Sequence, residues 1–133
     1  MSEQIILDNE WVTVRFHTKD KIIHHTFHQH FEGDMLRRAL NAGTEALKKN
    51  GATKWLSDDR NYGELSHDDV MFGLQDWGPR TAAAGWKFWA LVVPESMAGR
   101  ASMQAVVQAY WEMGVRVAIF TNVEDARAWL AKQ

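Results

Sequence analysis

Four polar residues, Asp58, Asp59, Arg60 and Asn61, directly follow a segment that begins at Thr53 and is expected to form a short buried strand. Two carboxylates beside a guanidinium could fix a loop through an ion-pair fork, bind a cation, recognise a ligand or partner, or work as acid and base. In α/β proteins, binding sites are built where buried strands end. We therefore interpret these four residues as the tip of a central strand and as the first candidate site.

Histidines are concentrated in one short segment that contains His24, His28 and His30. On an extended strand these three share a face, and His28 and His30 lie about 6.6 Å apart along the axis. Histidines at this spacing could bind zinc with a third ligand, for which His17 is a candidate. No HExxH motif accompanies them. The alternative is a solvated strand face that tolerates imidazoles, with His25 packed on the apolar face.

The chain has 7 Trp in 133 residues. Tryptophan is rarely hidden completely, and its N–H needs a partner when it is buried. Trp55 and Trp89 belong to a larger aromatic set that could line an apolar cavity or form a dimer face. The other interpretation is a core built from large side chains. That set comprises Trp55, Trp77, Trp86, Phe88 and Trp89.

Composition excludes several classes of protein. The 133 residues suit one domain, 1–133, with a sizeable core. The balance of 15 Lys+Arg against 17 Asp+Glu argues against nucleic-acid binding, and the lack of cysteine excludes disulfides and thiolate chemistry. No apolar run is long enough for a transmembrane segment, and the N-terminus does not resemble a signal peptide. We expect a cytoplasmic protein, and because no dinucleotide, P-loop or nucleophile-elbow motif occurs, no cofactor.

The elements that must position these residues begin with antiparallel strands. Trp11 to Phe16 alternates between apolar and polar residues, and Ile22 to His28 follows after a polar turn. A helix is expected between Asp34, which can cap it, and Gly51, which can end it. Its apolar stripe comprises Leu36, Leu40, Gly43 and Leu47. Glycine within such a stripe predicts close approach of this helix to a sheet.

The second half of the chain alternates helices and strands. Ser66 and Asp69 resemble a capping box, and Gly78-Pro79 is expected to break the helix that they start. The elements expected after that break are a short helix from Pro79 to Ala84, a strand from Trp86 to Val93, a helix from Ser102 to Met113, a strand from Val115 to Phe120 and a last helix capped by Thr121 or Asn122.

This order predicts an α/β fold with a mostly parallel sheet, an N-terminal antiparallel hairpin and right-handed crossovers with about four helices. Parallel strands that are covered on both faces should be apolar throughout. Lys54, Lys87 and Arg116 depart from that rule, because each falls within a predicted strand. One face is therefore only partly covered or meets a partner subunit, or the cationic stems reach past the sheet edge.

Several segments together resemble small bacterial proteins of the SpoIIAA-like group, which are related to STAS domains and to the Sec14/CRAL-TRIO fold. The resemblance covers nearly the whole chain and implies four turns of a right-handed strand–helix superhelix with helices mainly on one side. The segments that carry it are Trp55–Arg60, Trp77 with Pro79, Gly85, Ala90–Pro94, Phe120 and Ala126–Leu130.

The resemblance also bears on regulation. In anti-sigma-factor antagonists of that fold, a kinase phosphorylates a serine that follows an aspartate just after the central strand. Here Asp59 stands at the matching place, so the acceptor hydroxyl is missing, and Ser57 precedes the acidic pair. A carboxylate carries one charge where a phosphoserine carries nearly two.

From these observations we expect a non-enzymatic regulatory or binding domain for a partner protein or a small apolar ligand. Asp58, Asp59 and Arg60 would stand at the centre of recognition. Homodimerisation through a Trp-bearing surface is a further hypothesis. The alternative of a different class is a small metal-dependent enzyme that uses His24, His28 and His30.

Overall fold

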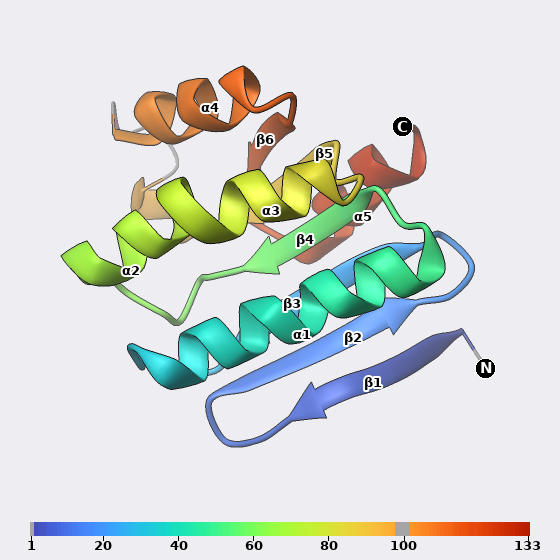
Figure 1. Cartoon of the computed structure of the whole chain (residues 1–133), viewed down its shortest axis with the longest axis horizontal. Helices are drawn as coiled ribbons and strands as arrows, with labels where there is room; N and C mark the ends of the chain where they lie inside the picture. Colours follow the sequence, from blue (N-terminus) through green and yellow to red (C-terminus); the bar gives the residue numbers. More distant parts are fainter. Residues whose placement is uncertain (1, 98–101) are drawn as a thin grey trace.

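The computed structural model describes residues 2–97 and 102–133 and contains one mixed six-stranded sheet in chain order, β1 to β6 (Figure 1). β1, β2 and β3 pair antiparallel, and β3 to β6 pair parallel. The predicted α/β class, with a mostly parallel sheet and antiparallel N-terminal strands, is confirmed. The strands are β1 (Glu3–Asp8), β2 (Val12–His17), β3 (Ile22–Phe27), β4 (Lys54–Asp58), β5 (Phe88–Val92) and β6 (Arg116–Phe120).

The helices are α1 (Asp34–Asn50), α2 (His67–Phe72), α3 (Gly78–Ala83), α4 (Ser102–Glu112) and α5 (Val123–Ala131), with a 3-10 turn at Glu95–Met97. Ser66 and Asn122 cap α2 and α5 through their side chains, as predicted. The predicted cap at Asp34 is wrong, because Gly33 occupies that position and Asp34 begins α1. Within the described residues, no helix is long and apolar enough to span a membrane.

The predicted break at Gly78-Pro79 is wrong. A π-helical turn (Gly73–Trp77) joins α2 to α3, so the helical path continues from residue 67 to 83. The wider turn bonds Gly78 N–H to Gly73 O, five residues back, and thereby accommodates a proline that lacks an N–H. A Cβ at position 78 would lie 2.5 Å from that carbonyl oxygen, so glycine permits the turn.

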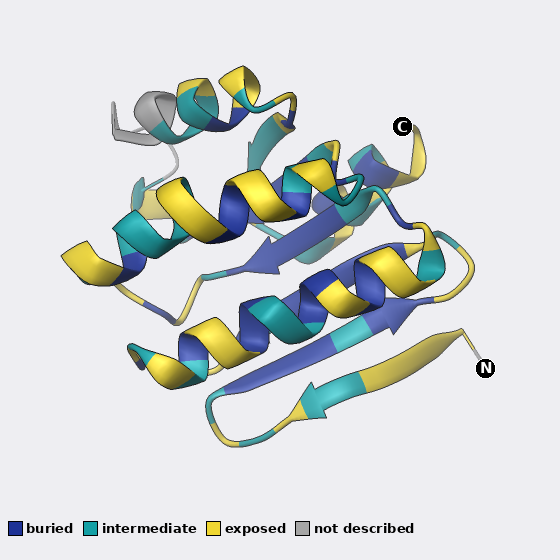
Figure 2. Ribbon diagram, viewed as in Figure 1, coloured by how far each residue is buried: buried dark blue, intermediate teal, exposed yellow. Residues whose placement is uncertain are grey.

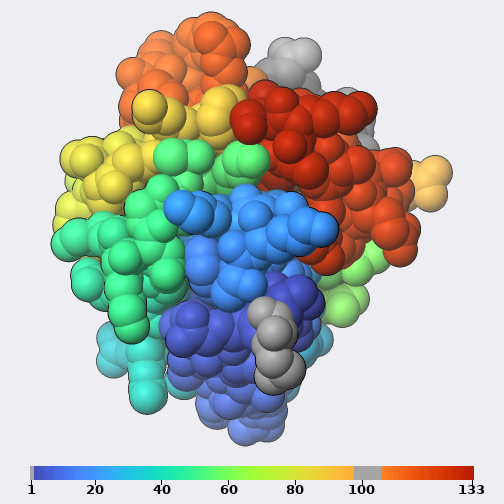
Figure 3. Space-filling model, turned by 90° about the vertical axis from the view of Figure 1, so that its right-hand side faces the viewer, coloured from blue at the N-terminus to red at the C-terminus, as the bar shows by residue number. Residues whose placement is uncertain are grey.

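The helices cover the two faces of the sheet unequally. Side chains of α1, α3 and α4 pack with those of β2 to β6 in the larger core, while α5 packs on the opposite face over β4, β5 and β6. Figure 3 shows α5 on one side of the N-terminal strands and α1 on the other. The three helical crossovers between parallel strands therefore all lie on one face.

Four tryptophans fill the larger core. Trp55, Trp77, Trp86 and Trp89 are all buried, and their rings contact one another mostly edge to face or tilted. Figure 2 shows the surrounding strands β2 to β4 as buried and much of β1 as exposed. Gly43 confirms the predicted close approach, because a Cβ there would lie 2.3 Å from the Trp55 ring. Most of the tryptophan surplus is thus used inside the domain.

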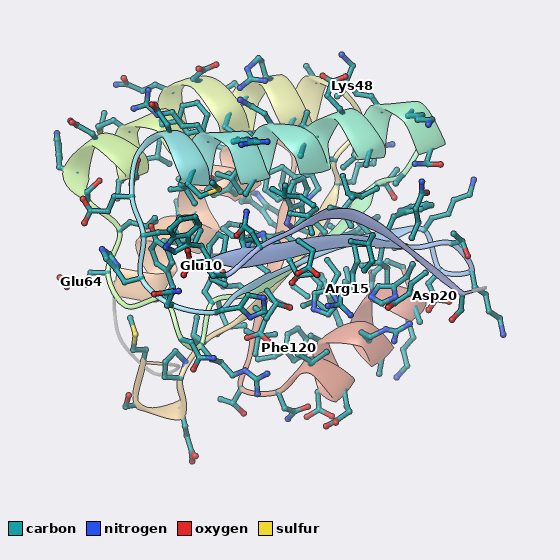
Figure 4. The ribbon with its side chains drawn as sticks, turned by 90° about the horizontal axis from the view of Figure 1, so that it is seen from below. Glu10, Arg15, Asp20, Lys48, Glu64 and Phe120 are labelled. Carbon is teal, nitrogen blue, oxygen red and sulfur yellow. The ribbon has the colours of Figure 1, made fainter. Side chains whose placement is uncertain are left out.

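The face that carries α5 is only partly covered by helices. Beneath β2, this face presents Arg15 (Figure 4), and Arg127 of α5 reaches Asp20 in the β2–β3 turn at 3.3 Å. Lys54 and Arg116 are the first residues of β4 and β6, and Lys87 comes just before β5. These cations therefore lie at the amino ends of the strands, where their stems reach solvent.

Candidate functional site

The candidate site is the β4 tip, which consists of Asp58, Asp59, Arg60 and Asn61. β4 lies between β3 and β5, so its last residue, Asp58, is flanked by a strand on each side. The N–H of Asp59 donates to Val92 O at 2.9 Å and ties the start of the loop to β5. The tip is therefore anchored at the centre of the carboxyl edge.

Asp58 is buried and bound by Arg60 in a two-point fork. Arg60 Nε donates to Oδ1 at 2.9 Å, and Nη2 donates to Oδ2 at 2.8 Å. Burial favours the neutral carboxyl and opposes ionisation, but the hydrogen bonds and charge of Arg60 outweigh it, so the pKa of Asp58 is lowered. The guanidinium stays about 42% exposed while its carboxylate partner is buried.

Asp59 binds a different partner on the opposite face of the sheet. Its Oδ1 lies 2.7 Å from His25 Nε2, and the indole N–H of Trp55 donates to His25 Nδ1 at 3.0 Å. Indole only donates and an ionised carboxylate only accepts, so His25 is neutral with its proton on Nε2. The ring also stacks on Phe27, with centroids 4.1 Å apart. Burial, stacking and two hydrogen bonds together fix the orientation of His25.

The two adjacent carboxylates do not share a site. Asp58 points to the α5 side with the alternation of β4, whereas Asp59 meets His25 on the side of α1. Each already has a hydrogen-bonding partner on its own face. The pair therefore lacks the shared geometry that a cation site or an acid–base dyad requires.

A second histidine holds the loop just after the tip. His30 Nδ1 lies 3.0 Å from Tyr62 O, and Nε2 lies 2.7 Å from Glu32 Oε2. Both oxygens only accept, and only the imidazolium carries a proton on both ring nitrogens. The hydrogen bond that His30 donates to the Glu32 carboxylate, followed by the one that it donates to Tyr62 O, raises the pKa of His30. His30 is exposed, so this charged bridge lies at the surface.

Tyr62 completes the attachment of the loop. Its hydroxyl donates to Phe31 O, and its ring packs against Phe27 and Phe31. Burial raises the pKa of Tyr62 above its ordinary range. Neither the role of His30 as a loop anchor nor that of Tyr62 was predicted from the sequence. The only local signal was the turn-forming pair Asn61 and Gly63 on either side of a buried-type aromatic residue.

The predicted histidine face is divided among separate partners. His24 is buried and lies 2.9 Å from His17, from Nδ1 to Nε2, while His28 Nε2 lies 2.8 Å from the Thr13 hydroxyl. His30 is engaged by Glu32 and Tyr62. In the part of the chain that the structure describes, no three His, Cys, Asp or Glu side chains gather as a metal site.

His17 and His24 form a buried pair of neutral imidazoles. Burial, and then the neighbouring His17, lower the pKa of His24 to about 3. Burial, followed by the charge of Arg127, also lowers the pKa of His17. One ring therefore donates to the other, and neither carries a charge at neutral pH.

The two tryptophans proposed as binding residues point into the core. Trp55 is 0% exposed and Trp89 is 9% exposed. Trp89 Nε1 donates to Ser57 Oγ at 2.7 Å, so the serine that precedes the tip is buried and engaged. Of the predicted site residues, Arg60 and Asn61 are the exposed ones at the tip.

Lysines and most of the exposed loop carboxylates lie toward opposite ends of the strands. Figure 4 shows Glu10 and Glu64 at one end of the molecule and Lys48 at the other. The exposed carboxylates in the loops and first helical turns at the carboxyl edge are Glu10, Glu32, Asp34, Glu64, Asp68, Glu95, Glu124 and Asp125. The exposed lysines at the amino edge are Lys19, Lys21, Lys48, Lys49, Lys87 and Lys132. Arg60 thus lies in a largely acidic surrounding.

Two hollows on the surface lie away from the tip and are open to solvent. One, of about 290 Å³, lies between α1 and α3 and is lined by Thr44, Glu45, Lys48, Arg80, Ala83 and Ala84. The other, of about 100 Å³, is lined by Trp111, Gly114, Val115 and Arg116. Neither is an enclosed apolar cavity.

No family model, curated protein or solved structure matches this chain.

Proposed function

We propose that this chain is a non-enzymatic regulatory or binding domain of the SpoIIAA-like type, and that it recognises a partner protein at the carboxyl edge of its sheet. Arg60 and Asn61 make the central contacts. The observation that carries this proposal is that the β4 tip is fixed from both faces of the sheet while these two side chains stay exposed. A recognition surface that is already ordered loses less entropy on binding.

The state of the ionisable groups favours binding over catalysis. A general base needs a free lone pair within reach of a substrate proton. The Nδ1 lone pair of His25 is occupied by Trp55 N–H, and Asp59 accepts from the other ring nitrogen. Asp58 is occupied by Arg60. These contacts hold the loop in place, and they leave His25 without a free lone pair for proton transfer.

The packing of the domain favours a protein partner over a small apolar ligand. Trp55, Trp77, Trp86 and Trp89 occupy the core, where a lipid-like ligand would need space. The hollow between α1 and α3 is open and carries the charged groups of Glu45, Lys48 and Arg80. The carboxyl edge of the sheet is polar and its loop is ordered, as is common in the surfaces that bind another protein.

The arrangement of the elements supports the SpoIIAA-like part of the proposal. Successive parallel strands are joined by helices on one face, as the strand–helix superhelix requires. Asp59 replaces the phosphorylated serine of the fold's regulators, and Ser57 is buried. Recognition in this chain would therefore not be switched by phosphorylation at the tip.

The charge around the tip specifies the partner. Exposed carboxylates such as Glu64, Glu124 and Asp125 share this edge with Arg60, and the charge of Glu124 acts on its guanidinium. A partner with a basic patch and one acceptor group for Arg60 would be complementary to this edge. Its association rate would fall as salt is added, because surface charges are screened.

Site-specific crosslinking in cells of the source organism tests this proposal. A photo-reactive amino acid at Asn61 should yield one crosslinked protein of defined mass, and Arg60→Ala in the same chain should reduce its yield. The matched control places the photo-reactive group at Lys48, on the opposite edge, where that product should be missing. Equal products from both positions, or an unchanged yield with Arg60→Ala, would contradict recognition at the tip.

A further inference from the structure

The two outer strands of the sheet differ in how they are protected from further pairing (Figure 1). β1 contains a bulge between Ile5 and Leu7 and exposes Glu3 and Asp8, features that discourage edge-to-edge association. β6 pairs with β5 in unbroken register, and four of its five residues, Val117, Ala118, Ile119 and Phe120, are apolar. By these criteria β1 is a protected edge and β6 is not.

Backbone hydrogen bonds define what β6 presents on its outer side. Arg116 N–H donates to Lys87 O at 2.8 Å, and Val93 N–H donates to Phe120 O at 2.9 Å. Residues 116, 118 and 120 therefore face β5, and by alternation Val117 and Ile119 direct their N–H and C=O groups outward. Within residues 2–97 and 102–133, no strand pairs with this outer side. These backbone groups remain available to an added strand.

We propose that β6 pairs antiparallel with β6 of a second copy of this chain, about a two-fold axis at Ala118. In that register Val117 of one copy lies opposite Ile119 of the other. The outward N–H and C=O groups of both residues then find partners in both copies, because such opposite residues exchange both hydrogen bonds. Val117 of each copy pairs with Ile119 of the other, so the pairing is self-complementary, as a two-fold interface requires.

Charge complementarity favours a second copy over an unrelated peptide. In the same register Arg116 lies opposite Phe120 of the other copy, so it approaches the first turn of that copy's α5. Two exposed carboxylates, Glu124 and Asp125, lie in that turn. The symmetry of the pair repeats this contact on the other side of the axis. An interface of this kind places opposite charges at both ends of the new strand pair.

Side chains beside the edge add apolar area to the interface. Trp111 is 52% exposed at the end of α4, and the Arg116 guanidinium lies over its ring, 4.4 Å from the centroid. Phe120 is half-buried, with its ring 6.0 Å from that of Trp129. Tryptophan and arginine are the residue types that contribute most at interfaces. This dimer differs from one formed by the core tryptophans and does not depend on the proposed recognition at the β4 tip.

Sedimentation velocity from low to high micromolar concentration tests the inference. We expect wild type to form a dimer and Ile119→Pro to be a monomer with an unchanged circular dichroism spectrum, because proline removes an outward donor and leaves the bonds to β5 intact. The control at the other edge, Ile5→Lys, should keep the dimer.

Charge exchange provides a second readout that does not rely on proline. Arg116→Glu should weaken the dimer, and adding Glu124→Lys to the same chain should restore part of it. A wild type that remains monomeric, a dimer that survives Ile119→Pro, or a dimer lost with Ile5→Lys would each overturn the proposal. So would a monomer that pairs only with an added extended peptide.

Discussion

Two histidines hold the loop that follows β4, and they do so in opposite protonation states. His25 is buried, contacts a donor on one nitrogen and a carboxylate on the other, and is neutral. His30 is exposed, contacts an acceptor on each nitrogen and is charged. We call the contacts of His25 with Asp59 and Trp55 the buried bridge, and those of His30 with Tyr62 and Glu32 the exposed bridge. The buried bridge depends on burial and packing, and the exposed bridge depends on pH. The comparison indicates that a buried neutral ring makes one attachment of the loop and an exposed charged ring makes the other.

The largest effect should come from removing the buried bridge. His25→Ala leaves the Trp55 N–H without its partner in the core and opens a cavity beside Phe27. We expect the free energy of unfolding to fall by about 3 kcal/mol. Urea denaturation of wild type and variant measures this free energy. His25→Gln is the matched control, since an amide can still accept from Trp55 and donate to Asp59, so its loss should be clearly smaller. Equal losses would contradict the hydrogen-bonded role.

Acid should destabilise the domain through the buried pair of His17 and His24. The folded pKa of His24 is about 3 against an ordinary 6.5, so below pH 6.5 the unfolded chain binds the extra proton. The stability contributed by the neutral ring is complete above pH 6.5 and is lost progressively down to about pH 3. By pH 5 the loss should reach about 2 kcal/mol.

The pH dependence of chemical denaturation measures this effect. In His24→Gln the slope between pH 6.5 and pH 5 should be shallower than in wild type, whatever the absolute stability of the variant. An identical slope in the two proteins would show that His24 is not the titrating group.

A smaller effect is expected from the Asp58 fork. Asp58→Asn removes the ionic part of the pair, but Arg60 is about 42% exposed, so solvent screens much of it and we expect about 1 kcal/mol. The folded pKa of Asp58 is lowered, so its contribution is present above its ordinary pKa of 3.8 and disappears as the pH falls through the folded value. Thermal melting at neutral and acidic pH, with Glu64→Gln as the exposed control, measures this difference. A difference that persists at low pH would contradict the ionic role.

The smallest effect should be the release of the exposed bridge. The folded pKa of His30 is raised, so its contribution is complete below the ordinary pKa of 6.5 and is lost as the pH rises through the folded value. Amide signals of Tyr62 and Gly63 should shift with the His30 ring over that range. Glu32→Gln should move this transition to lower pH, because it removes the first cause of the shift. A transition unaffected by Glu32→Gln would contradict the bridge.

Local pattern predicted much of the fold. The stripe of Leu36, Leu40 and Leu47 correctly placed α1, and turn chemistry placed the caps at Ser66 and Asn122. The short helix that starts near Pro79 was predicted, but its continuity with α2 could not be, because a π turn depends on tertiary packing at Gly78. Residue periodicity therefore predicts the regular helices and strands but not the π turn at Gly73–Trp77.

The candidate site was predicted in position but not in its contacts. Alternation along β4 already implies that Trp55 faces the opposite side from Asp58, and the prediction of Trp55 as a binding residue did not use that alternation. The partnership of Asp59 with His25 joins residues 34 positions apart, which no local signal reveals. The sequence likewise contains no indication that His30 would meet Tyr62, because that contact exists only after the sheet has formed.

The most direct test of the two-bridge comparison is long-range proton–nitrogen NMR of the histidine rings at pH 6.5. We expect His25 to show a protonated Nε2 and an unprotonated Nδ1, and His30 to show protons on both nitrogens. In Asp59→Asn and Glu32→Gln, only the ring that loses its own partner should change. If His25 carried protons on both nitrogens, or if either substitution changed both rings equally, the β4 tip would not be held by one neutral and one charged histidine.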